Sequence, residues 1–208
     1  MTIIYESDSH KVVIERDDDP INPREWDNLG TMVCAHDRYN LGDEKAERLA
    51  RYRDWDSYYK GVILESPSIV ATVALPLYLY DHSGITMSTS PFTSRWDSGQ
   101  VGWIYAYESD FKDIPDVYVD GQFDHDKARD ILKSEVTVYD QYLRGDVYSY
   151  TLEKKEVCAC CNHTRYTPIH SCGGIFAESE ADSIAYVKDD LSEEYKAILA
   201  PENIVYED

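Results

Sequence analysis

The longest stretch of alternating side chains covers residues 69–80. One of its two faces would consist of aliphatic residues only, and a period of two is that of a β-strand. Pro76 has no backbone N–H to donate, so we expect this strand at a sheet edge or beside a bulge. Residues 101–107 and 146–152 have the composition of two more strands. The three segments together predict an antiparallel sheet.

Residues 125–144 follow a longer period. Apolar side chains recur there every three or four positions, as on the buried face of an α-helix. Asp124 is the predicted N-cap of this helix, and Gly145 is the residue that ends it. Two shorter helices are expected over residues 178–188 and 192–199.

A further helix is predicted to begin at Asp43, which we place as its N-cap, and to continue through Tyr52. This helix would gather five basic residues, namely Lys45, Arg48, Arg51, Arg53 and Lys60. The surface is therefore expected to be patchy, with a basic helix between acidic stretches.

Composition favours one folding unit. The chain has 208 residues, of which 43% are apolar, and this is enough to fill one core. We expect a single compact α+β domain over residues 1–208, with a central antiparallel sheet, flanking helices and a cysteine-rich hairpin. No apolar run is long enough to span a membrane, and residues 1–10 lack the pattern of a signal peptide, so a cytoplasmic location is expected.

Four of the five cysteines fall between residues 158 and 172. Thiolate and imidazole are the ligands that structural zinc prefers, so residues 156–174 are interpreted as a hairpin insertion clipped by zinc. The predicted ligands are Cys158, Cys161, His170 and Cys172, with Cys160 and His163 as rivals. A catalytic zinc is disfavoured because it normally keeps an open position with an acid nearby. Free thiols without metal stay open as the alternative.

The net charge of the protein is -20, and it is concentrated in residues 1–19, 108–126 and 176–208. Such a charge repels phosphate, so direct binding to nucleic acid or to an anionic membrane is not expected. General solubility is a competing explanation. Adaptation to a salty cytoplasm is another, although Lys is as frequent as Arg and the chain has 18 Tyr.

If the acidity is functional, a basic partner protein would bind the acidic residues of the second and third stretches. The predicted partner-binding residues are Glu108, Asp110, Asp113, Asp116, Asp120, Asp124, Asp126, Glu178, Glu180, Asp182, Asp189, Asp190, Glu193 and Glu194.

Three segments of the chain have distinctive residue patterns. They are LYLYDHSGITMSTSPF at residues 77–92, continued by RWDSGQVGWIY at 95–105, NPREWDNLG at 22–30 and VYDQYLRGDVY at 138–148. With these blocks the chain resembles an uncharacterised family of small acidic proteins of phages and mobile elements. The resemblance implies a phage context and assigns no chemistry to particular residues.

Enzymatic readings are weaker. Asp81, His82 and Ser83 are neighbours on an extended chain, so they point to opposite faces and cannot align as a catalytic triad. A metal-dependent hydrolase would need clustered acids such as Asp110, Asp113, Asp116 and Asp120, but alternation with apolar residues makes these the exposed side of a surface segment. We therefore expect no enzyme.

The polar, turn-rich residues 83–99 are interpreted as a connection between two apolar strands, with Trp96 and Trp103 as packing anchors. A contact surface on this loop is the functional alternative.

The leading hypothesis is a phage counter-defence protein whose carboxylates imitate the phosphates of a nucleic acid. Its partner would be a basic host immune complex, with a CRISPR effector favoured and a restriction enzyme next. The alternative is a zinc-clipped adaptor in which acidity serves only solubility.

Overall fold

The computed structural model describes residues 2–46, 49–63, 71–94 and 96–205. These residues form two compact units, unit 1 (Met1–Ile21 and Gly145–Asp208) and unit 2 (Asn22–Arg144). The expectation of one compact domain is therefore not met. The physical reason is that each unit has apolar cores of its own, built from separate sets of residues. The expected α+β class is confirmed, with two five-stranded sheets in place of one central sheet.

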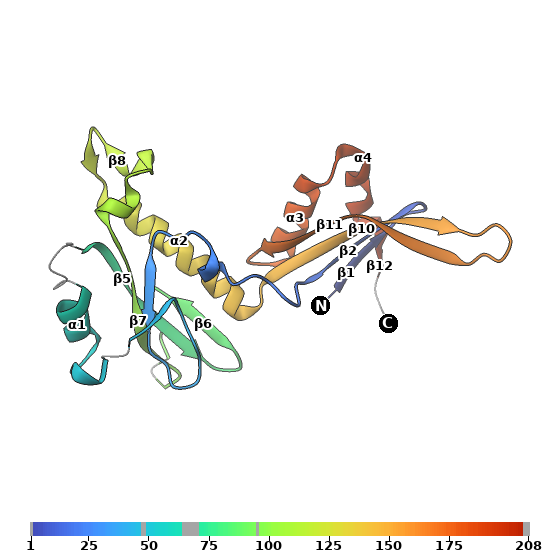
Figure 1. The fold of residues 1–208 in the computed structure, drawn as a ribbon. Coiled ribbons are helices and arrows are strands. Elements are labelled where there is room, and N and C mark those ends of the chain that lie inside the picture. Colours follow the sequence, from blue (N-terminus) through green and yellow to red (C-terminus); the bar gives the residue numbers. More distant parts are fainter. Residues whose placement is uncertain (1, 47–48, 64–70, 95, 206–208) are drawn as a thin grey trace. The chain divides into compact units, whose positions relative to one another are not determined.

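Unit 1 joins the two ends of the chain in one sheet (Figure 1). Its elements are β1 (Thr2–Glu6), β2 (His10–Arg16), β10 (Val147–Val157), β11 (Thr164–Phe176), α3 (Glu180–Asp190), α4 (Glu193–Lys196), the 3-10 turns at Ala197–Leu199 and Pro201–Asn203, and β12 (Ile204–Val205). The strand order is β11-β10-β2-β1-β12, and every pairing is antiparallel.

One face of this sheet is apolar because alternate residues of its strands point to the same side. Val12 and Ile14 of β2 lie opposite Leu152 and Tyr150 of β10, and all four side chains are buried. Apolar residues of α3 and of the following turns cover them, including Val187. Unit 1 thus has the core of an independent small domain.

Unit 2 contains a second five-stranded sheet in the order β4-β3-β7-β5-β6. Its strands are β3 (Thr31–Cys34), β4 (Glu44–Lys45), β5 (Ala71–Asp81), β6 (Ile85–Ser88) and β7 (Ser98–Tyr107), with a small hairpin of β8 (Tyr118–Val119) and β9 (Gln122–Phe123). Its helical segments are α1 (Trp55–Tyr58), a π-turn at Tyr59–Ile63, α2 (His125–Arg144), and 3-10 turns at Pro23–Glu25, Leu49–Arg51, Glu108–Phe111 and Pro115–Val117. All strand pairs are antiparallel except β3 with β4.

Each face of this sheet packs against a different layer. Leu132 and Val136 of α2 join Ile104 of β7 in the larger core, whereas Tyr58 of α1 packs beside Val33 in a smaller one. Gly102 lets β7 approach β3 closely, because a Cβ atom there would lie 2.2 Å from the carbonyl oxygen of Val33. Unit 2 is therefore a sheet between two helical layers.

The helix over residues 125–144 is confirmed as α2 with both of its ends. The Asp124 side chain accepts the backbone N–H groups of Asp126 and Lys127 at 3.0 and 3.1 Å, as an N-cap does. Gly145 ends the helix with a φ of 70°, in the left-handed region that favours glycine. The helices expected near residues 178–188 and 192–199 correspond to α3 and to α4 with its following turn.

The helix predicted from Asp43 through Tyr52 is wrong over its described residues. The chain after Asp43 enters β4 and then the 3-10 turn at Leu49–Arg51, and α-helix begins only at Trp55. The Asp43 carboxylate is not a cap, because it accepts the backbone N–H of Met32 at 2.7 Å and binds Arg24. The basic residues Lys45, Arg51, Arg53 and Lys60 are accordingly spread over several elements, and Arg48 lies outside the described residues.

The strand predicted over residues 69–80 is β5, although Ile69 and Val70 lie outside the described residues. Pro76 lies outside the stretch that pairs with β6 and next to a register shift at Leu77 and Tyr78, as expected for a strand proline. Within the described ranges, no helix is both long and apolar enough to cross a membrane.

Of the two predicted packing anchors, only Trp103 is one. Its ring stacks on Tyr59 at 4.5 Å between centroids, and its Nε1 donates to the carbonyl of Trp55 at 3.2 Å. Trp96 is 98% exposed, so its prediction as an anchor is wrong. The reason is that the described residues 89–94 and 96–97, between β6 and β7, are not buried.

Candidate functional sites

The acidic residues 108–126 of unit 2 lie on an ordered segment. Phe111 and Val117 point into the core, with exposed fractions of 0% and 1%. Each of them anchors one of the two 3-10 turns that carry acidic residues of this segment. Of the predicted partner-binding residues in this segment, Glu108, Asp110, Asp113, Asp116, Asp120 and Asp126 are exposed, and Asp124 is half-buried.

Some of these acids are already engaged within the protein. Asp110 accepts the backbone N–H of Tyr107 at 2.8 Å, Asp124 caps α2, and Asp126 pairs with Arg129 at 2.9 Å. Among the described residues, the carboxylates of Asp113, Asp116 and Asp120 form no ion pair, although Lys127 Nζ donates to the backbone carbonyl of Asp116 at 2.8 Å. These three carboxylates are therefore the ones most available to a basic partner.

The second acidic set belongs to unit 1, on α3, α4 and the turn that precedes α3. Its exposed members are Glu178, Asp182, Asp189, Asp190, Glu193 and Glu194, and Glu180 is half-buried. The buried Val187 and Leu191 hold this helical layer on the sheet. The carboxylates of this set are thus presented from ordered backbone.

Asp190 differs from the rest of this set because it is bound on the sheet side. The Tyr150 hydroxyl donates to its Oδ2 at 2.5 Å, and Nε2 of His170 lies 3.5 Å away. The Tyr150 hydrogen bond lowers the pKa of Asp190; partial desolvation opposes this effect, and the contact with His170 adds to it. Asp190 therefore acts first as a link between α3 and the sheet.

Three cysteines meet at the end of the β10–β11 hairpin. The sulfur atoms of Cys158, Cys160 and Cys161 lie within 4.8 Å of one another, and those of Cys158 and Cys160 are 2.9 Å apart. Hydrogen bonds from Cys160 and then Cys161 lower the pKa of Cys158 to about 7. A thiolate is thus accessible at neutral pH, as a metal ligand requires. The three cysteines can bind a metal ion.

The predicted ligands His170 and Cys172 are not part of this cluster, so the predicted set of four is wrong. Both lie within β11, where His170 is opposite Leu152 and Cys172 is opposite Tyr150. At about 3.3 Å per residue, they are roughly 20 and 26 Å along the strand from the turn. The predicted hairpin is present, but its second strand is continuous from Thr164 to Phe176 and its turn contains only residues 158–163.

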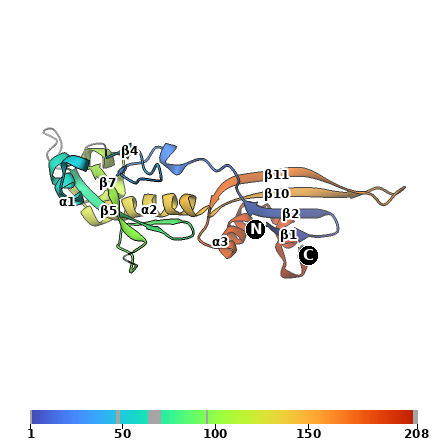
Figure 2. The same cartoon turned by 90° about the horizontal axis from the view of Figure 1, so that it is seen from below.

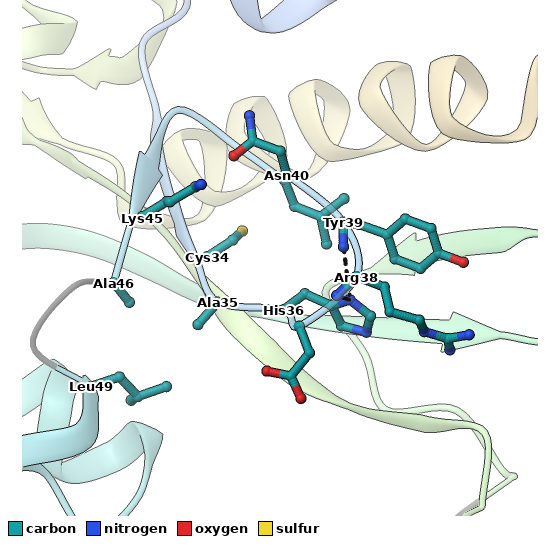
Figure 3. A pocket seen from close by; sticks show the side chains of 11 residues that line it. Cys34, Ala35, His36, Arg38, Tyr39, Asn40, Lys45, Ala46 and Leu49 are labelled. Atoms are coloured by element: carbon teal, nitrogen blue, oxygen red, sulfur yellow. Dashed lines mark hydrogen bonds between the residues drawn. The ribbon is translucent and has the colours of Figure 1, made fainter.

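An open cavity of about 600 Å³ lies in unit 2 beside the loop after β3 (Figure 3). The His36 Nδ1 accepts the backbone N–H groups of Arg38 and Tyr39 at 3.2 and 3.3 Å, and the His36 ring stacks on Tyr39. Arg38 pairs with Asp81 from the end of β5. The sequence did not single out this loop, because it has no periodic pattern and its contact at Asp81 is 43 residues away.

The residues considered for a catalytic triad or a hydrolase metal site do not come together in the described structure. Asp81 binds Arg38 and Tyr39, whereas His82 lies 3.6 Å from Asp97, and Ser83 occupies the turn between β5 and β6. Within the described ranges, the acids near residues 110–120 do not bring three ligand atoms together, since only the three cysteines do so. Burial raises the pKa of Cys34 to about 12, so this thiol is protonated and unreactive.

Residues of the three distinctive sequence blocks have structural contacts in unit 2. Arg24 binds Asp43, Glu135 and the carbonyl of Gly30, and Asp140 accepts the backbone N–H of Met87 at 2.6 Å. Comparison of the chain with protein-family models, curated proteins and solved structures finds no match.

Proposed function

We propose that this protein is a non-enzymatic inhibitor that binds a basic, nucleic-acid-binding host protein through its acidic surfaces. The observation that carries the proposal is the display of exposed carboxylates from ordered elements in both units. Unit 1 has 19 acidic and 7 basic residues and unit 2 has 21 and 13, so both are negative as wholes. A basic channel that evolved to bind phosphates is attracted by such arrays.

A role in phage counter-defence follows from the resemblance to proteins of phages and mobile elements. Host immune complexes act on nucleic acid in basic channels, so they are the partners that such a protein would inhibit. We favour a CRISPR effector as the target and place a restriction enzyme next, with binding in the host cytoplasm. The protein itself does not bind nucleic acid under this proposal, because its charge repels phosphate.

Charge reversal tests this proposal. The triple variant Asp113→Lys, Asp116→Lys, Asp120→Lys changes three unit 2 acids whose carboxylates form no ion pair among the described residues. We expect it to lower the association rate with the partner, recovered by affinity purification from host cells, by about 10- to 1,000-fold at low salt. The equivalent variant of unit 1 is Glu178→Lys, Asp189→Lys, Glu194→Lys.

The matched control reverses Glu25, Asp27 and Asp56, which are exposed acids of unit 2 outside the acidic stretches. It changes the net charge by the same amount as each test variant. If the control weakens binding as much as both test variants do, only the total charge matters and the proposed acidic surfaces have no specific role. Unchanged binding in both test variants would contradict the proposal outright.

The second candidate function is a protein-interaction adaptor with a metal-bound hairpin, and the three clustered thiols favour it. We propose zinc as the ion, because it is bound by thiolates in most small cysteine clusters and has no redox chemistry of its own. Binding to the partner would then depend on the hairpin and change little with salt, which separates this function from the first.

A further inference from the structure

The cysteine cluster supplies three ligands for an ion that takes four. Zinc in a structural site is almost always bound by four protein ligands in a tetrahedron. The described residues place three sulfur atoms together, and no histidine nitrogen or carboxylate oxygen of the described ranges joins them. His170 and Cys172 are held in β11 by their pairing with β10 and cannot reach the turn.

Backbone pairing holds the hairpin along its length up to the turn. Ten residue pairs join β10 and β11, from Val147 opposite Phe176 to Val157 opposite Thr164. The turn is closed by two backbone hydrogen bonds, from Cys158 N–H to the carbonyl of His163 and from Asn162 N–H to the carbonyl of Cys158, both at 2.9 Å. Asn162 adopts a φ of 55°, which asparagine tolerates better than most residues. The turn is therefore held by hydrogen bonds of its own backbone.

The turn is also open to its surroundings. β10 pairs with β2 only as far as Lys154 opposite His10, and the last backbone bond to that side joins Lys155 N–H to Ser9. Beyond it the hairpin continues past the end of β2, as Figure 2 shows. Cys160 and Cys161 are exposed, and so is the neighbouring Val157 at 56%. A donor atom from outside the chain can approach the three sulfurs.

A catalytic use of the open position has little support. The nearest acid along β10, Glu156, is engaged with Lys154 at 2.9 Å and lies on the strand before the turn. The residues of the turn itself, Cys158 to His163, include no carboxylate, and the His163 nitrogens are not part of the group of ligand atoms that the three cysteines form among the described residues. The site can bind a further ligand but has no carboxylate placed beside it to activate water.

We propose that Cys158, Cys160 and Cys161 form a three-thiolate zinc site whose fourth position is filled by an exchangeable donor from outside the chain. The chemical class of that donor is a nitrogen or sulfur ligand, such as a histidine or cysteine side chain of a bound protein. The inference rests on the zinc proposed above. It makes the hairpin tip a metal-dependent docking point and not a structural clip.

Cobalt(II) in place of zinc tests the site in the full-length protein, kept reduced without thiols. We expect one equivalent to bind with a tetrahedral spectrum, and added imidazole to shift that spectrum without releasing the ion. Cys158→Ser, Cys160→Ser and Cys161→Ser should each weaken zinc binding by at least about tenfold, since even loss of a second-shell partner costs about 10- to 100-fold. His170→Ala and Cys172→Ser are the matched controls and should leave affinity unchanged.

The outcomes separate the two proposals. If the wild-type protein binds neither zinc nor cobalt, the zinc proposal fails and this inference fails with it. If the ion binds but imidazole has no effect, or if His163→Ala, His170→Ala or Cys172→Ser weakens binding as the cysteine variants do, the site is closed by a fourth protein ligand. In that case zinc stands and the open position is wrong. Unchanged circular dichroism in each variant shows that the hairpin has kept its fold.

Discussion

Replacing Arg24 with Met is expected to lower the free energy of unfolding of unit 2 by about 3 kcal/mol, because it leaves two acids without their cation. The Arg24 side chain is 3% exposed and bonds to both oxygens of Asp43, at 2.9 and 2.7 Å, and to Glu135 at 3.1 Å. Burial alone would lower the pKa of Arg24. The bonds to Asp43 and then to Glu135 outweigh this effect, so the pKa of Arg24 is raised. The expected loss is at the lower end of the usual range, since Asp43 keeps 23% of its side chain exposed.

Tryptophan fluorescence measures this loss in unit 2 alone, because Trp26, Trp55, Trp96 and Trp103 all belong to that unit. Denaturant titration of the Arg24→Met variant should show the shift, and Arg24→Lys should recover only part of it, since an ammonium cannot reproduce the fork of the guanidinium. Arg129→Met is the control on α2 and should cost less than about 0.5 kcal/mol, because its pair with Asp126 is exposed. Equal stability of Arg24→Met and wild type would show that this network contributes nothing net.

Phe111→Ala is expected to destabilise unit 2 by about 3 to 5 kcal/mol and to loosen the acidic segment that it anchors. The Phe111 side chain has no exposed surface and meets Phe123 edge-to-face at 5.5 Å between centroids. Its removal leaves a cavity beneath residues 108–123. The affinity for a basic partner should fall as well, although no carboxylate has been changed. The reason is that the carboxylates of this segment would no longer be held in a fixed arrangement.

Fluorescence-detected unfolding and amide hydrogen exchange over residues 108–123 measure the two effects. Lys112→Ala is the matched control, since it changes the exposed neighbour of Phe111 and should leave both stability and exchange near wild type. A loss below about 1 kcal/mol, with unchanged exchange, would mean that the segment is held by other contacts.

The parts of the fold that could be predicted are those set by neighbouring residues. The helix α2 was predicted with both ends because its period, its N-cap and its terminal glycine are all local signals. The edge character of β5 at Pro76 is local in the same way, since the missing N–H belongs to the residue itself.

The parts that could not be predicted depend on distant residues. The role of Asp43 was missed because its partner Arg24 is 19 residues away, and Glu135 is 111 residues from Arg24. The division into two units was missed because β2 pairs with β10, which follows more than a hundred residues later. The metal ligands were misassigned in part because Pro168 and Ser171 suggested a turn between Thr164 and Cys172, whereas the pairing with β10 makes this segment a strand.

The central claim is that the acidic surfaces occupy a partner's nucleic-acid channel, and competition with DNA tests it most directly. The partner recovered from host cells is bound to labelled double-stranded DNA, and the full-length protein is added at increasing salt. We predict that the protein displaces the DNA, that displacement weakens as salt rises, and that the two charge-reversal variants displace it poorly while the control variant does not differ from wild type. A partner that binds the protein and DNA at the same time, with an affinity insensitive to salt, would contradict the claim.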